Sequence, residues 1–574
     1  MKSNSISCLL LASGATLLNI GSAHAAEILV TNNIATSTTW VSTNTYNLIG
    51  QIYVQPGVTL TIQPGTVIAS EVGGSLAVTR GARINAVGTN ESPIIFTSKA
   101  DVATWTNGDP RTGTWRPECN EWGNLTIMGR GYISENAVAA NTASPNASNI
   151  ATMEGLTAAS PTDTNVIYGG GNDEDDSGSL AFCSFRYGGK VVGLNNELNG
   201  LSLGGVGRET NIDHMEIMNN VDDGIEIWGG AVNLKYITIW NIGDDSLDID
   251  QGWRGKVQFG LIVQGYSALA AQGSGTGDNC IEMDGAEQSD YQPVTTGVMY
   301  NMTVIGNPGS NATGSNGGDH GTAWRDNARM QIRQSIFMDL GEKLVALDNI
   351  DGDGGSGYGF NGTTSWINLW TTPFSTTSTV NAPAAPGNFY KAQSSGMLNE
   401  IKDTVFFNNI NTAAYTEADA RGVRTKGQNN VTATTLPIAA ITRGPVVNPT
   451  ITLAVKPVIS IDPRAANDSV NAVSTSPNDG FFEPVSYRGA FSSTGNWLCG
   501  WTAADAFGMN VAPPGGCVIV GVCIGDVDGN GTVGASDLAE LLSAWGTSDI
   551  DLDGDGVTGA ADLAAMLGNW GLCN

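Results

Sequence analysis

Three short segments near the middle of the chain carry acidic residues at the spacing of a β-strand. Residues 221–230 read VDDGIEIWGG, residues 243–252 read GDDSLDIDQG, and residues 277–286 read GDNCIEMDGA. In each segment apolar residues alternate with acidic ones, and this period of two is typical of a half-buried strand. Stacked strands would bring the acids into one column. Grouped carboxylates can supply the general acid and base of glycoside hydrolysis, and they also bind Ca²⁺.

The two Asp-Asp pairs supply the candidate catalytic residues, and the outward positions of the strands supply the candidate substrate-binding residues. The candidates for catalysis are Asp223, Asp244 and Asp245, and those for substrate binding are Trp228, Glu226, Asp248 and Glu282. Trp228 can stack on a sugar ring or pack under a loop. The column as a whole has three interpretations, namely a catalytic cluster, a structural or calcium-bridged acid ladder, and a sugar-binding groove.

Two twelve-residue loops near the C-terminus predict calcium binding. Residues 526–537 read DVDGNGTVGASD and residues 551–562 read DLDGDGVTGAAD, so the loops begin 25 residues apart (551 − 526). Oxygen side chains at positions 1, 3 and 5, Gly at 6, a backbone carbonyl at 7 and a carboxylate at 12 suit Ca²⁺. The predicted ligands are Asp526, Asp528, Asn530, Thr532 and Asp537, then Asp551, Asp553, Asp555, Val557 and Asp562.

One apolar helix is expected after each loop, over residues 538–546 and 563–571, and none is expected before either loop. Two loops with only an exiting helix resemble a type I dockerin. The resemblance implies calcium binding and docking to a cohesin-like protein. The sequence departs from the dockerin pattern at the positions that contact cohesin, which are Ala535-Ser536 and Ala560-Ala561, and the helices lack the usual basic pair.

The strands that carry the acids recur at a fixed spacing. Asp222 and Asp244 are 22 residues apart (244 − 222), and a Gly-, Ala- and Ser-rich insertion at residues 266–276 delays the third copy. One strand per 22 residues, in register, predicts coils of a parallel β-helix. Further strands are expected at residues 180–185, 212–218, 234–240 and 257–263, which gives two strands per coil.

The predicted fold class is all-β, a right-handed parallel β-helix of the pectin-lyase-like type followed by a small helical calcium-loop domain. The segments VQPGVTLTIQPGTVI, DDGIEIWGG and YRGAF…WLCGWT resemble a group of secreted bacterial β-helix proteins over residues 50–505. That resemblance implies the fold and no particular activity. Aromatic residues 481–501 are expected to close the end of the solenoid. The predicted domains are 1–25 (signal peptide), 26–509 (β-helix), 510–522 (linker) and 523–574 (dockerin-like).

Two adjacent coils also resemble the polygalacturonase-type glycoside hydrolases, in which one coil carries an Asp and the next an Asp-Asp pair. Asp223 matches the first, and Asp244-Asp245 matches the pair. The third coil of that family carries a His where this sequence has Asn279, and an Arg-x-Lys pair is not found at the expected place. His214 and His320, the histidines outside the signal segment, do not stand in a ligand or triad context.

Composition limits the classes of partner. Of 574 residues 75 are Gly and 14 % are charged, with a formal net charge of −29. Abundant Gly and few charges favour tightly turned β-structure over helical repeats, and an acidic surface repels nucleic acid and anionic lipid. Lys2, an apolar stretch and Ala23-His24-Ala25 are typical of a secretory signal, so we expect a secreted protein without membrane insertion.

Seven of the eight cysteines lie outside the signal segment, and an exported chain can form disulfides. The pairs Cys499–Cys517 and Cys523–Cys573 are the expected ones. Together these features predict an exported, Ca²⁺-binding β-helix protein that engages extracellular polysaccharide, as a glycoside hydrolase or lyase-like enzyme. The alternative is a non-catalytic adhesion or structural protein of the cell surface.

Overall fold

The computed structural model describes most of the chain from residue 26 onward. The described residues are 26–135, 145–193, 196–267, 277–286, 291–308, 320–347, 366–374, 387, 389–409, 428–448, 454–466, 468–512, 525, 527, 532–547, 550, 552 and 557–572. The predicted signal peptide and most of the predicted linker lie outside them.

A nine-stranded, all-parallel sheet forms one side of the molecule. Each of its strands has three or four residues, and neighbouring strands pair in register with one strand per coil. Its strands are β4 (Gln51–Val54), β7 (Ser75–Val78), β10 (Leu125–Met128), β16 (Leu201–Gly204), β18 (Ile225–Trp228), β20 (Leu247–Asp250), β22 (Ile281–Met283), β24 (Thr322–Trp324) and β27 (Val345–Leu347).

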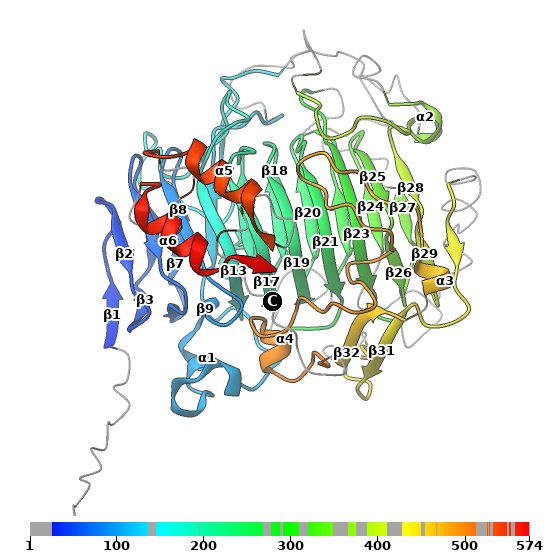
Figure 1. Ribbon diagram of the computed structural model, residues 1–574, viewed down its shortest axis with the longest axis horizontal. Helices are drawn as coiled ribbons and strands as arrows, with labels where there is room; N and C mark the ends of the chain where they lie inside the picture. Colours follow the sequence, from blue (N-terminus) through cyan, green and yellow to red (C-terminus); the bar gives the residue numbers. More distant parts are fainter. Residues whose placement is uncertain are drawn as a thin grey trace, which may run out of the picture.

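A seventeen-stranded sheet forms the remaining sides, and Figure 1 shows the strands side by side along the long axis of the molecule. Its strands are β1 (Ala26–Val30), β2 (Thr38–Trp40), β3 (Asn44–Leu48), β5 (Thr59–Ile62), β6 (Val67–Ser70), β8 (Arg83–Val87), β9 (Ile94–Ser98), β13 (Gly178–Arg186), β17 (Asn211–Asn220), β19 (Asn233–Ile242), β21 (Lys256–Val263), β23 (Thr296–Ile305), β25 (Arg329–Arg333), β26 (Ile336–Met338), β28 (Glu400–Lys402), β29 (Val405–Phe407) and β30 (Val431–Thr432).

The coils follow the predicted repeat. Ile225 pairs with Leu247 and Leu247 with Ile281, which are steps of 22 and 34 residues (247 − 225 and 281 − 247). Strands β13, β17, β19 and β21 confirm the four additional strands that were expected. These long strands bend at residues with positive φ, where the side chains of Phe182, His214 and Tyr236 stack with ring centroids 4.1 and 4.4 Å apart. Each central coil therefore has one short strand and one long, bent strand.

Apolar side chains from both sheets fill the interior of the coil. Ile225 and Ile227 of β18 and Leu247 and Ile249 of β20 are fully buried in one cluster with residues of β17 and β19. Removing this apolar surface from water is the main stabilising contribution to such a fold. The acidic residues between them face away from this core.

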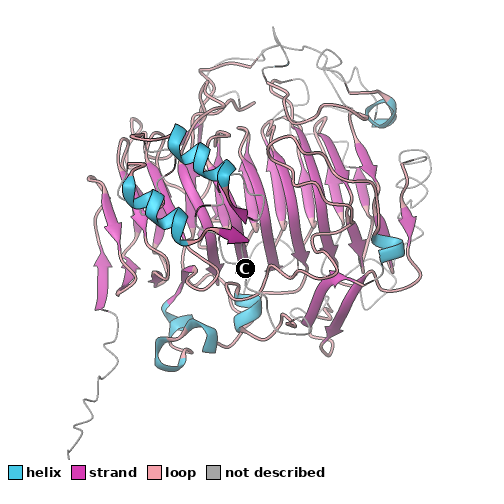
Figure 2. Cartoon of the chain, viewed as in Figure 1, coloured by secondary structure: helices cyan, strands magenta, loops and turns pink. Residues whose placement is uncertain are grey.

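The smaller elements lie outside the two large sheets, and Figure 2 shows how few of the elements are helices. Antiparallel pairs are formed by β11 (Ala151–Thr152) and β12 (Ile167–Tyr168), β14 (Val191–Gly193) and β15 (Asn196–Glu197), β31 (Ile438–Arg443) and β32 (Val458–Ala465), and β33 (Thr532–Val533) and β34 (Gly571–Leu572). The helices are α1 (Lys99–Val102), α2 (Trp366–Thr371), α3 (Asp468–Asn471), α4 (Ala503–Ala506), α5 (Ala535–Ser543) and α6 (Ala560–Gly568), with short 3₁₀ turns at Thr106–Gly108 and Pro110–Thr112.

A C-terminal segment, here called the strap (the described part of residues 454–512), packs on the outer side of the seventeen-stranded sheet. Ile461, Phe491 and Leu498 of the strap share an apolar cluster with outward residues of that sheet. The expectation that the aromatics of residues 481–501 close the end of the solenoid was therefore wrong. Their partners lie on the side of the sheet, as in the contact of Trp501 with Phe182 (5.7 Å between centroids).

Cys499, in the strap, is disulfide-bonded, and its partner lies outside the described residues. The predicted pairs Cys499–Cys517 and Cys523–Cys573 both involve such residues. Helices α5 and α6 begin at Ala535 and Ala560, three residues before the predicted starts. Among the described residues no helix is long and apolar enough to cross a membrane.

Candidate active site

The outward side chains of the nine-stranded sheet form the acidic column that the sequence predicts. Glu226 pairs in register with Asp248, and Asp248 with Glu282, while the residues on either side point into the core. Glu226 is buried, and the side chain of Glu282 is 16 % exposed. Three candidate substrate-binding carboxylates are thus brought together on one face.

A second row of polar side chains lies at the turns that enter these strands. Asp223 accepts a hydrogen bond through Oδ1 from the backbone N–H of Asp245 (2.9 Å), and Asp245 accepts one from the N–H of Asn279 (2.5 Å). Asn199 occupies the equivalent place one coil earlier, since its Oδ1 accepts from the N–H of Asp223 (3.1 Å). Asp223 and Asp245, both buried, therefore join successive coils, which is a structural task also performed by an Asn.

Ten carboxylates around these two rows, here called the acid cluster, form five groups of three. Within each group one oxygen per residue lies within 4.8 Å of the others. Asp244, predicted as catalytic, belongs to two of these groups and is partly exposed. The members are Glu154, Glu197, Asp222, Asp223, Glu226, Asp244, Asp245, Asp248, Asp278 and Glu282.

Two further side chains, those of His320 and Arg325, stand beside the acid cluster, although sequence reasoning places His320 in no ligand or triad context and does not consider Arg325. The Nδ1 of His320 lies 2.9 Å from Oδ1 of Asn279, and Nη1 of Arg325 lies 2.8 Å from Oε1 of Glu282. His320 comes from the coil after Asn279 and is 41 residues further along the chain, so spacing alone could not align it. In the sequence, the indication of such a role is limited to the position of His320 and Arg325 on either side of the short strand β24.

Burial and mutual repulsion raise the pKa of several of these carboxyls. Burial first, and then the charges of Asp278, Glu282 and Glu197, raise the pKa of Asp244 to about 7. Burial and the charge of Asp244 raise the pKa of Asp222 to about 8. A carboxyl with such a pKa still carries its proton for part of the time near neutral pH, as a general acid must.

Glu282 differs from its neighbours in the direction of its shift. Burial alone would raise the pKa of Glu282, but a hydrogen bond from Asp245 and the charge of Arg325 hold it below its ordinary value. Burial and the charge of Glu282 raise the pKa of Asp245 well above its ordinary value. One cluster therefore holds an ionised carboxylate beside protonated ones, and pairs with separated pKa values are the usual sign of acid and base roles.

Trp228 does not offer a surface to a sugar ring. Its side chain is 5 % exposed and lies 6.2 Å, between ring centroids, from Tyr168 of β12. Met153 and Val166, from the same excursion of the chain, complete the apolar cluster over this part of the sheet. The assignment of Trp228 to substrate binding is corrected to packing under a loop.

The two C-terminal loops are described only in part. Asp526, Asp528, Asn530, Asp551, Asp553 and Asp555 lie outside the described residues, as does the side chain of Thr532. Asp537 and Asp562, at position 12 of each loop, are fully buried and make matching hydrogen bonds. Asp537 accepts from the N–H groups of Val527 (2.6 Å) and Gly534 (2.7 Å), and Asp562 from those of Leu552 (2.6 Å) and Gly559 (2.5 Å). Val557 is exposed.

Comparison with known proteins identifies the solenoid. A family described as "Pectate-lyase like beta helix domain" matches residues 32–348, which is 317 residues (348 − 32 + 1) and more than half of the chain. The match includes both rows of the acid cluster. Neither the curated proteins nor the solved structures contain a match to this chain.

Proposed function

Because this chain belongs to the pectate-lyase-like β-helix family, which suggests a carbohydrate-related function, we propose that it cleaves the glycosidic bonds of an extracellular polysaccharide. The acid cluster is the proposed site. The observation that carries the proposal is the pair formed by Asp244, whose pKa burial raises to about 7, and Glu282, whose pKa is held low.

In this proposal Asp244 is the general acid and Glu282 the general base. Asp244 donates its proton to the glycosidic oxygen as the bond from that oxygen to the anomeric carbon breaks. Glu282 takes a proton from a water molecule whose oxygen bonds to the anomeric carbon. Asp223 and Asp245 then serve as positioning residues, because their hydrogen bonds fix the turns that carry Asp222, Asp244 and Asp278.

A screen for released reducing ends tests the proposal. The full chain is incubated with a panel of acidic and neutral polysaccharides, alongside Asp244→Asn and a control, Asp109→Asn, whose carboxylate pairs with Arg111 on an exposed loop. We expect activity on at least one glycan, a loss of 10²-fold or more in Asp244→Asn, and an unchanged rate in the control. Equal rates in all three proteins would reject the assignment.

The second candidate function is a cation-bridged, non-catalytic ladder. It is favoured by the five groups of carboxylates whose oxygens lie within 4.8 Å, a spacing that one Ca²⁺ can span. A bound cation would relieve the repulsion and keep the carboxylates ionised. If so, Ca²⁺ should raise the melting temperature of the solenoid, and the screen above should find no cleavage.

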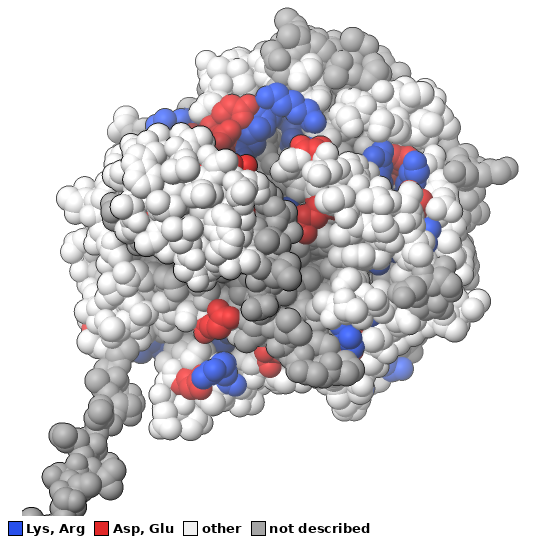
Figure 3. Space-filling model, viewed as in Figure 1, with Lys and Arg blue, Asp and Glu red and all other residues white. Residues whose placement is uncertain are grey.

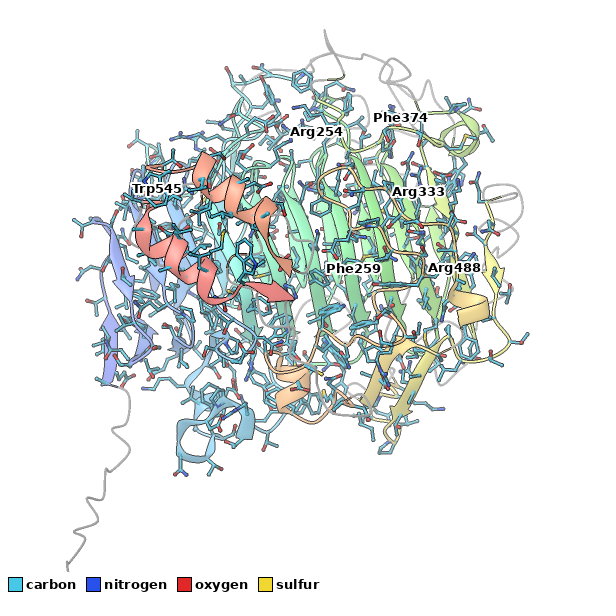
Figure 4. All side chains as sticks on the ribbon, viewed as in Figure 1. Arg254, Phe259, Arg333, Phe374, Arg488 and Trp545 are labelled. Atoms are coloured by element: carbon cyan, nitrogen blue, oxygen red, sulfur yellow. The ribbon has the colours of Figure 1, made fainter. Side chains whose placement is uncertain are left out.

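We further propose that residues 523–574 bind two Ca²⁺ and dock to a partner protein of an exported assembly. The matching hydrogen bonds of Asp537 and Asp562 support two equivalent loops. Leu542 and Trp545 recur 25 residues later as Leu567 and Trp570, and about half of each side chain is exposed. Exposed aromatic and aliphatic side chains of this size suit a protein interface. Figure 4 labels Trp545 beside α5.

A further inference from the structure

A recess lies on the seventeen-stranded sheet, whereas the acid cluster lies on the nine-stranded one. It is a pocket of about 290 Å³ between the first residues of β17 and β19, the preceding loop and the strap. Its lining includes Arg208, Asp213, Asn233, Lys235 and Phe481. That volume is at the small end of ligand sites, which suits a ligand of about one sugar ring.

The charges that line this pocket balance. Arg208 and Lys235 are matched by Glu209 and Asp213, so the lining as a whole favours neither an anion nor a cation. Nζ of Lys235 also lies 3.2 Å from Oε1 of Glu483, and this carboxylate offsets the charge of Lys235 further. Figure 3 shows that charged side chains are sparse on the viewed face and that several of them lie in groups of both signs. A neutral ligand with many hydroxyls fits this lining best.

One lining residue, Arg208, has a nitrogen that the described part of the chain does not satisfy. Nη1 of Arg208 pairs with Glu174, but Nη2 is buried, and no described residue accepts a hydrogen bond from it. This nitrogen has almost no accessible surface, so the polar groups that a ligand in the pocket can reach are those of the other lining residues. Asp213 and the amide of Asn233 add acceptors and donors at the same recess.

Phe481 gives the recess its apolar surface. Its ring is partly buried, and Nζ of Lys235 lies 5.0 Å from the ring centroid. Gly480, beside it, has open space where a Cβ would stand. A flat apolar ring flanked by charged groups of both signs can contact the C–H face of a pyranose while the charged groups bind its hydroxyls.

We propose that this pocket binds one neutral pyranose residue, through paired hydroxyls held by Asp213, Asn233 and Lys235. The site lies on a different sheet from the acid cluster and does not depend on catalysis there. Its role is to hold a glycan chain against the solenoid.

Calorimetry on the full chain tests this inference. The probes are the methyl glycosides of glucose, galactose and mannose, with methyl glucuronoside as the acidic comparator. We expect one neutral glycoside to bind at a single site, and the Kd to rise about tenfold or more in Lys235→Met and in Asp213→Ala. Lys99→Met removes an exposed charge that pairs with Glu27 and Glu71, neither of which lines the pocket, and its Kd should equal that of the wild type.

Several outcomes would overturn the inference. These are no binding of any neutral glycoside, unchanged Kd in both pocket variants, or tighter binding of the acidic comparator. Loss of binding in Asp244→Asn would assign the sugar to the acid cluster instead. If the chain binds a neutral glycoside at this pocket but does not hydrolyse any glycan, the proposed hydrolase function fails and the pocket assignment does not. Thermal unfolding checks that each variant is folded. If Lys235→Met is not folded, Phe481→Leu is measured in its place and should raise the Kd in the same way.

Discussion

At the scale of single residues, the acid cluster contains carboxylates with two different tasks. Asp223 and Asp245 accept backbone hydrogen bonds from the next coil, as Asn199 does. Asp244 and Glu282 are partly exposed and have pKa values shifted in opposite directions. The Asp-Asp pairs therefore combine one residue that shapes the turn with one that is available for chemistry.

Substitutions at Asp223 should separate its structural task from its charge. Asp223→Asn keeps an oxygen acceptor for the N–H of Asp245 and should leave stability within about 0.5 kcal/mol of the wild type. Asp223→Ala leaves that buried N–H without its acceptor and should cost about 1–3 kcal/mol. Thermal unfolding of the three proteins checks this. Equal destabilisation by Asn and Ala would show that the charge, and not the acceptor, matters.

At the scale of elements, the strap depends on one buried carboxylate of the sheet. Glu216 of β17 is fully buried and accepts hydrogen bonds from the N–H groups of Ala503 (2.5 Å) and Ala504 (3.0 Å), at the start of α4. The Ser184 hydroxyl donates a third (2.5 Å). Glu216 thus anchors the start of α4 to the outer side of the solenoid, in addition to the apolar cluster that packs the rest of the strap there.

Loss of this anchor should release the strap before the solenoid unfolds. Glu216→Ala leaves the two N–H groups unpaired, and we expect destabilisation of about 2–5 kcal/mol, because the bonds are charge-assisted. Limited proteolysis should cut near residues 500–507 sooner than in the wild type. The control is Glu209→Gln, which changes an exposed residue in the turn before β17. Identical cleavage patterns in both variants would contradict the anchoring role.

The C-terminal repeat should bind Ca²⁺ through each of its loops. The closing carboxylate at position 12 is expected to be required in each loop, so Asp537→Ala and Asp562→Ala should each remove one equivalent of bound Ca²⁺ from the full chain. Calorimetry measures the stoichiometry, and any Ca²⁺ still bound by the double variant belongs to the acid cluster. Unchanged stoichiometry in the double variant would rule out these loops.

Much of the solenoid follows from the sequence, because its strands have a simple apolar period that stacking repeats. The strands that carry Ile225, Leu247 and Ile281 could be aligned from their shared pattern of apolar and acidic residues, although the third follows after a longer step. His320 could not, because 41 residues separate it from Asn279, and the pairing of β22 with β24 brings it to the cluster. Burial of Trp228 likewise depends on a loop that lacks periodicity.

At the scale of the whole molecule, the acid cluster makes stability depend on pH. Burial raises the pKa values of Glu154 and Asp244 to about 7 and of Asp222 to about 8, and that of Asp250, which lies outside the cluster, to about 6. Raised values mean that the folded state holds protons that the unfolded chain releases near pH 4. Stability should therefore fall as the pH rises from about 4 to about 8.

Melting temperatures measured in chelator at pH 5 and pH 8 check this prediction. We expect the higher value at pH 5, and a smaller difference in Asp222→Asn, which lacks one of the titrating groups. If Ca²⁺ bridges the ladder, adding it should raise the value at pH 8 most. A melting temperature that is higher at pH 8 in chelator would contradict the directions of these pKa shifts.

The central claim is that Asp244 acts as a general acid and Glu282 as a general base, and the pH dependence of hydrolysis tests it most directly. On the glycan found by the screen, kcat/KM should fall above about pH 7 as Asp244 loses its proton. Glu282→Gln should lower the rate at every pH, and Asp244→Asn should abolish the alkaline decline together with most of the activity. A rate that stays constant or rises above pH 8, or that is unaffected by either substitution, would contradict the account.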